Sequence, residues 1–109
     1  MKTSIHNLPP SLRVGPYDIK IVTLPEDIAR DNYGCFTSRA LEIGLCDKFP
    51  STVFAGETLL HELLHAAWYV QGIKAKDGEE RVVGNLAISL TQILRDNPTL
   101  LDWLKNALK

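Results

Sequence analysis

The stretch from residue 51 to residue 72 constrains the fold of this chain more than any other part of the sequence. Its apolar residues recur at spacings of three and four, as they do on one face of an α-helix. Ser51 or Thr52 can cap the start of this helix, and Gly72 can end it after Gln71. We therefore expect a long helix over residues 52–71 that packs one face against a core. The apolar positions of that face are Leu60, Leu63, Leu64, Ala67 and Val70.

Two more helices are expected after the long one. A polar connection over residues 74–78 is followed by a second amphipathic stretch. Asn97 and Pro98 end that stretch and start a third helix, with Asn97 as its cap and Pro98 at its first position. The second apolar stripe comprises Val82, Val83, Leu86, Ala87, Leu90, Ile93 and Leu94, and the third comprises Leu100, Leu101, Leu104 and Leu108.

The first fifty residues have the pattern of strands. Apolar and polar residues alternate from Tyr17 to Thr23 and again from Leu41 to Leu45, which indicates two half-buried strands. Residues 26–33 are polar enough for a short helix or a loop, and Pro9-Pro10 closes an irregular leader. The sequence therefore predicts an α+β fold in one domain over residues 1–109. In this fold a small antiparallel sheet precedes three packed helices.

Composition and charge exclude several classes of protein. Twelve Lys and Arg against thirteen Asp and Glu give a net charge of −1, whereas a nucleic-acid-binding protein usually has a basic face. No stretch approaches the roughly 20 apolar residues of a membrane span, and the first residues do not form a secretory signal. We expect a cytoplasmic protein in which Cys35 and Cys46 are reduced thiols, with a bridge between them as the alternative.

The segment His61-Glu62-Leu63-Leu64-His65 indicates metal chemistry. Histidines four residues apart lie one above the other on a helix, so both imidazoles can bind one ion. Glu62 lies about 100° further round the helix, where its carboxylate can act as a general base without binding the metal. We predict that His61 and His65 bind one zinc ion per chain and that Glu62 is catalytic. The alternative is a helix that carries two half-exposed histidines and a surface carboxylate without metal.

A catalytic zinc usually has three protein ligands and one open position. Because no histidine follows His65, the third ligand is expected to be a carboxylate near the start of the next helix. Glu80 is favoured, since it shares a face with the apolar residues of that helix, and Glu79 and Asp77 are the alternatives. Asp77 and Glu80 also have the spacing of a capping box, which would give Glu80 a structural role instead.

This arrangement resembles the minimal zincins, and among them the ImmA/IrrE-type and SprT-like metallopeptidase-like proteins of phages and bacteria. The resemblance rests on the HExxH motif at residues 61–65, a strand before it, and the stretch from Glu80 to Ala87, which is similar to the helix that holds the third ligand. The residues from Asp96 to Leu101 look like the tail of small phage members. The chain departs from SprT-like proteins in having no third histidine, and it lacks the DNA-binding region of larger relatives.

The motif and the resemblance predict a zinc-dependent peptidase. Because so small a chain can form only a shallow cleft, we expect it to act on one specific protein target. The resemblance also implies that an extended peptide pairs with the strand Leu41 to Leu45, if that strand is an open edge rather than an internal strand. Trp68 and Tyr69 are expected to be structural, although the Tyr69 hydroxyl could stabilise an oxyanion. Two alternatives remain open. One is a zincin-like module that binds a host or phage protein without hydrolysis, and the other is a metal-free helical interaction domain.

Overall fold

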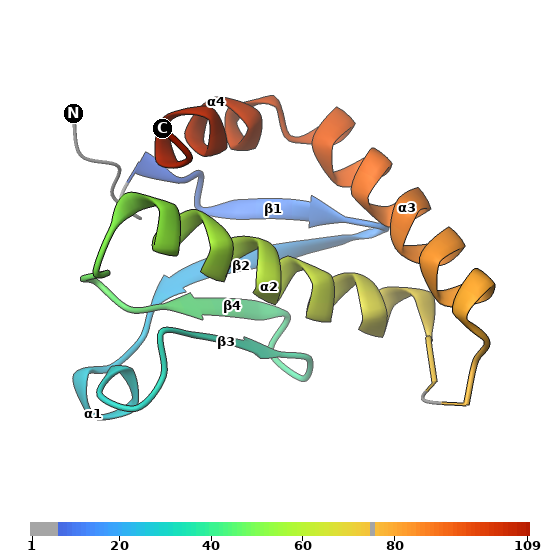
Figure 1. Ribbon diagram of the computed structural model, residues 1–109. Helices are drawn as coiled ribbons and strands as arrows, with labels where there is room; N and C mark the ends of the chain where they lie inside the picture. Colours follow the sequence, from blue (N-terminus) through green and yellow to red (C-terminus); the bar gives the residue numbers. More distant parts are fainter. Residues whose placement is uncertain (1–6, 75) are drawn as a thin grey trace.

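The computed structural model describes residues 7–74 and 76–109 (Figure 1). The expected leader before residue 7, with His6, and the side chain of Val83 lie outside this description. The predicted α+β fold with a small sheet and three further helices is confirmed, and the sheet has four strands. The elements are β1 (Ser11–Val14), β2 (Tyr17–Thr23), α1 (Glu26–Ala29), β3 (Gly34–Thr37), β4 (Glu42–Leu45), α2 (Thr52–Gln71), α3 (Glu79–Asp96) and α4 (Pro98–Ala107).

The sheet is mixed, so the prediction of an antiparallel sheet is wrong at its centre. The strand order is β1-β2-β4-β3, with β1 antiparallel to β2, β4 parallel to β2, and β3 antiparallel to β4. After β2 the chain passes through α1 and then forms β3 at the edge of the sheet. Strand β3 runs opposite to β2, and β4 runs opposite to β3. Strand β4 therefore lies beside β2 and runs in the same direction as β2. The sequence pattern indicated only β2 and β4, and the extra strand between them reverses the direction.

Helix α2 lies across one face of the sheet (Figure 1), and it contacts α3 and α4 as well as the strands. The chain turns into α2 at Ser51, whose hydroxyl accepts a hydrogen bond of 3.1 Å from the Phe54 amide. It leaves α2 at Gly72, whose φ of 63° favours glycine. Both predicted ends of this helix are confirmed. The core joins the sheet to all three long helices through Leu12, Ile19, Ile43, Leu45, Leu59, Leu63, Ala66, Ile93, Leu100 and Trp103.

Asn97 is the N-cap residue of α4, as predicted, but its side chain makes no cap hydrogen bond because it bonds to β1 and α3 instead. Its Oδ1 accepts a hydrogen bond of 2.9 Å from the Arg13 amide. Its Nδ2 donates to the carbonyls of Arg13 and Ile93, at 3.0 and 2.7 Å. The predicted first helical position of Pro98 is confirmed. Asn97 therefore joins the end of α3 to the first strand, whereas a side-chain cap would have stabilised only the start of α4.

Replacing Asn97 with alanine is expected to lower the free energy of unfolding by about 2 kcal/mol, because the buried amide makes three hydrogen bonds. Chemical denaturation measures this change. Asn106→Ala is the matched control, since Asn106 is exposed on α4. Equal stability of the two variants would contradict the structural role of Asn97.

Within the residues that the structure describes, no helix is long and apolar enough to cross a membrane.

Candidate functional site

Helix α2 brings the two motif histidines together on its exposed side. The Nε2 atoms of His61 and His65 are 3.2 Å apart, and their rings meet edge to face with centroids 4.9 Å apart. Two imidazole nitrogens bound to one tetrahedral zinc ion, at about 2.05 Å each, would be about 3.3 Å apart. The separation in the structure therefore fits two ligands of a single ion.

Glu62 faces the sheet, unlike the two histidines. It is only 6 % exposed and lies against β3 at Gly34. A Cβ at position 34 would lie 3.1 Å from Glu62 Cγ, 3.3 Å from Glu62 Oε2 and 2.8 Å from Thr58 Cγ2. Since Cβ atoms essentially never come as close as 2.8 Å, glycine is what allows β3 to approach α2 here. Gly34 thus makes room for the Glu62 carboxylate between helix and strand.

The Glu62 carboxylate has no hydrogen-bond or ion-pair partner among the described residues of the chain. A carboxylate so deeply buried is unfavourable unless something satisfies it. Its oxygens still reach solvent, because the described part of the structure holds no fully buried polar side-chain atom without a partner. Glu62 is therefore buried but can still be reached by a ligand from solvent, as is expected of a group that acts on a bound molecule.

Two hollows meet at this cluster and form a groove between α2 and β3. The first, of about 490 Å³, extends toward Phe36 and Tyr69. The second, of about 310 Å³, extends toward Asp31 and Glu57. We call them the aromatic hollow and the acidic hollow. The residues that line both are Gly34, His61 and Glu62.

The strand beside the groove is β3, which the sequence pattern did not indicate. It pairs with β4 on one side, and in the sheet as described no strand covers its other side. Strand β4, which contains most of the predicted edge Leu41 to Leu45, lies between β2 and β3. Of the two alternatives for Leu41 to Leu45, the open edge is therefore wrong and the internal strand is confirmed. Strand β3 lies at the edge of the sheet instead.

The structure does not bring a third ligand to the histidines. Over residues 7–74 and 76–109, no three His, Cys, Asp or Glu side chains gather so that they could hold a metal ion. Glu79 and Glu80 are exposed in the first turn of α3. Asp77 accepts a hydrogen bond of 2.7 Å from the Lys74 amide, and no capping box forms because Gly78 is the N-cap. Glu80 as a third ligand stays a prediction.

Tyr69 belongs to the site, whereas Trp68 does not line it. Tyr69 follows His65 by one turn, lines the aromatic hollow, and is 51 % exposed. Its ring packs against Phe36 with centroids 6.0 Å apart. The lining residues that the motif gave no signal for include Asp31, Tyr33, Gly34, Cys35, Phe36, Ser38, Phe54 and Glu57.

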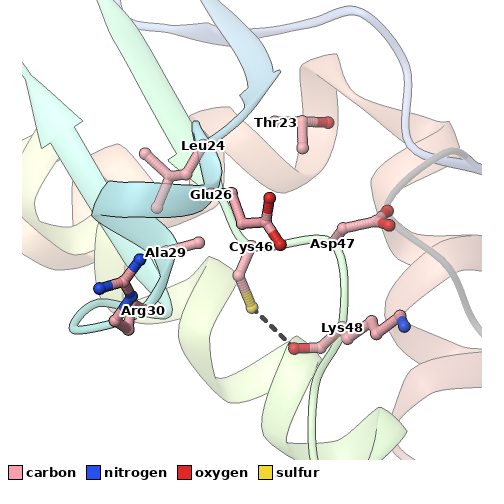
Figure 2. Close-up of a pocket in the computed structure, with 8 residues that line it drawn as sticks. All are labelled: Thr23, Leu24, Glu26, Ala29, Arg30, Cys46, Asp47 and Lys48. Atoms are coloured by element: carbon pink, nitrogen blue, oxygen red, sulfur yellow. Dashed lines mark hydrogen bonds between the residues drawn. The ribbon is translucent and has the colours of Figure 1, made fainter.

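A third hollow, of about 750 Å³, lies at the ends of β2 and β4 and shares no lining residue with the groove (Figure 2). Both cysteines are free, and Cys46 lines this hollow while Cys35 lines the groove. The Cys46 thiol donates a hydrogen bond of 2.9 Å to the Lys48 carbonyl, drawn in Figure 2. Burial raises the pKa of Cys46 above the ordinary value of a thiol.

This shift predicts a loss of stability at alkaline pH. Because the pKa of Cys46 is higher in the folded state, its stabilising effect is complete below the pKa of an unfolded thiol, about 8.5. The effect is lost as the pH rises through the folded pKa. The free energy of unfolding should therefore fall less steeply above pH 8.5 in Cys46→Ala than in the wild type. Cys35→Ala, at an exposed thiol, is the control and should follow the wild-type curve.

Comparisons with known proteins gave no match. No protein-family model matches the chain, and no curated protein or solved structure matches it.

Proposed function

We propose that this chain is a zinc-dependent peptidase with His61 and His65 as metal ligands and Glu62 as general base. One observation carries the proposal. Two imidazole nitrogens 3.2 Å apart stand at a groove whose wall holds a buried carboxylate without a partner in the described structure. A two-histidine, one-carboxylate set of this kind suits metal-assisted hydrolysis.

The residues divide the chemistry between them. When bound, zinc acts as a Lewis acid that polarises a carbonyl group and makes water more acidic. Glu62 takes a proton from the attacking water and later gives it to the leaving amine. Its place between α2 and β3, where Gly34 leaves it room, holds the carboxylate at the point where the two hollows meet.

The open edge of β3 supports an extended peptide as substrate. A peptide that pairs with this edge satisfies the free backbone groups of β3, and its carbonyls then lie along the groove. The zincin-like architecture forms part of this proposal, since it places a motif helix on one face of a sheet beside an open edge strand. The third ligand in this proposal is Glu80, which requires the first turn of α3 to come closer to the histidines than it does in the structure.

A second candidate is a module that binds a protein partner along the β3 edge without hydrolysis. The same open edge favours it, because strand addition needs no metal. In this case a bound peptide would remain intact in the presence of zinc.

Incubation of the zinc-loaded protein with a mixed peptide library, followed by mass spectrometry, tests the proposal. We expect cleavage of a small subset of peptides that stops when a chelator is added and resumes when zinc is restored. A shallow groove gives few contacts, so we expect slow or no cleavage of casein. Failure to cleave any peptide under zinc saturation would contradict the peptidase and leave the binding module.

A further inference from the structure

The two hollows on either side of Glu62 differ in charge and in chemistry. Apart from the motif residues, the described lining of the acidic hollow contributes two carboxylates, Asp31 and Glu57, and no Lys or Arg. The described lining of the aromatic hollow contributes Phe36 and Tyr69, and apart from the motif it has no charged side chain. The groove is therefore acidic at one end and neutral and aromatic at the other.

The acidic hollow also contains aromatic rings, which can bind a cation through their faces. Tyr33 and Phe54 line it with ring centroids 4.7 Å apart. A Lys or Arg side chain gains from carboxylates and from the faces of aromatic rings together. A negatively charged side chain would meet Asp31 and Glu57 as like charges.

Glu62 is a second indication of a ligand here, independent of Asp31 and Glu57. It is only 6 % exposed, lacks a partner among the described residues, and lines both hollows. A molecule that reaches Glu62 must therefore pass over the place where the hollows meet, and its two ends extend into different surroundings.

The direction of β3, together with the direction in which a peptide pairs with it, sets which end of the peptide lies in which hollow. Gly34, at the start of β3, lines the acidic hollow as well, whereas Phe36 and Ser38, at its end, line only the aromatic hollow. Antiparallel pairing is slightly more stable per residue than parallel pairing, so we take the peptide to run opposite to β3. Its amino-terminal residues then lie over the aromatic hollow and its carboxyl-terminal residues over the acidic hollow.

We propose that the groove selects a peptide with an apolar side chain before the reacting carbonyl and Lys or Arg after it. This specificity rests on one part of the proposed function, which is that a peptide binds in the groove. Binding measurements alone can show it, without cleavage. Charge pairs at an exposed site are modest individually, so Lys is expected to be preferred over Glu by about tenfold when two carboxylates contribute. The preference should shrink as salt is added.

The test uses fluorescent octapeptides that are identical except at two central positions, which are Phe-Lys, Phe-Glu or Lys-Phe. Their dissociation constants are measured by anisotropy with zinc-loaded Glu62→Gln protein, which should bind without cleaving. We expect Phe-Lys to bind about tenfold more tightly than Phe-Glu and also more tightly than Lys-Phe. Asp31→Lys and Glu57→Lys, made in the same background, should abolish or reverse the preference for Lys.

Asp102→Lys is the matched control, because Asp102 is exposed on α4 and lines neither hollow. It should keep the preference, and circular dichroism should show that all three charge-reversed proteins fold. Equal binding of Phe-Lys and Phe-Glu, no measurable binding of either, or a preference that survives both groove substitutions would overturn the proposed specificity. Tighter binding of Lys-Phe would overturn the direction. If binding shows the preference but the wild type cleaves none of these peptides, the specificity stands and the peptidase proposal fails.

Discussion

His61→Ala is expected to lower the zinc content of the purified protein from about one ion per chain to nearly none. The two imidazole nitrogens lie 3.2 Å apart, as two ligands of one ion would, so removing one leaves His65 without the partner it needs. Loss of an outer-shell partner can already cost a zinc site about 100-fold in affinity, and loss of a direct ligand should cost more. Elemental analysis of both proteins, purified without added metal, measures the effect.

Thermal unfolding separates a bound metal from a trace contaminant. Zinc that binds only the folded protein raises its melting temperature in proportion to the logarithm of its concentration above the dissociation constant. The wild type should show this rise, and His61→Ala and His65→Ala should not. Asn106→Ala, at an exposed residue of α4, should behave as the wild type. If the wild type binds no zinc even when metal is added back, the enzyme proposal fails and a histidine-bearing helical module remains.

The third ligand can be identified by the same measurement. Glu80→Gln should weaken zinc binding, whereas Glu79→Gln and Asp77→Asn should not. In the structure these carboxylates do not lie together with the histidines. Weaker zinc binding by Glu80→Gln alone would therefore also show that the start of α3 moves toward the histidines when the metal binds.

The sequence predicted those elements whose pattern lies within one stretch of chain, and it missed those that depend on contacts with distant residues. The bounds of α2 could be predicted because its apolar periodicity, the Ser51 cap and the Gly72 stop all lie in one stretch of chain. The strands β1 and β3, of four residues each, have too few positions to show a clear period, and β4, of the same length, could be predicted only because Leu41 extends its alternation to five residues. The existence of β1 and β3 depends on partners elsewhere in the sequence, and so does the parallel pairing of β2 with β4.

The same limit explains the candidate site. The spacing of His61 and His65 within one helix is sufficient to predict that their nitrogens converge. The edge strand, the acidic hollow and the role of Gly34 all depend on how β3 packs against α2. Asn97 is a further case, because a local rule favoured a helix cap while hydrogen bonds to Arg13, far away in the sequence, took its side chain.

Glu62→Gln is expected to lower kcat/KM for any peptide the protein cleaves by about 10³-fold, since a positioned general base contributes about 10²–10⁴-fold. Glutamine keeps the size of the side chain but cannot take a proton. The variant should retain its zinc, because Glu62 is not one of the proposed zinc ligands and lies against Gly34 of β3. Cleavage rates and zinc content measured on the same preparation distinguish loss of the base from loss of the metal.

Stability distinguishes a catalytic Glu62 from a structural one. A buried carboxylate without a partner in the described chain is costly to the folded state, and a neutral amide of the same shape costs less. Glu62→Gln should therefore unfold at the same temperature as the wild type or a few degrees higher, as is common when a functional group that destabilises the fold is removed. Glu57→Gln, on the same helix but exposed, should leave the melting temperature unchanged. A clear drop in the melting temperature of Glu62→Gln would mean that the carboxylate stabilises the contact between α2 and β3, and its burial would then need no catalytic explanation.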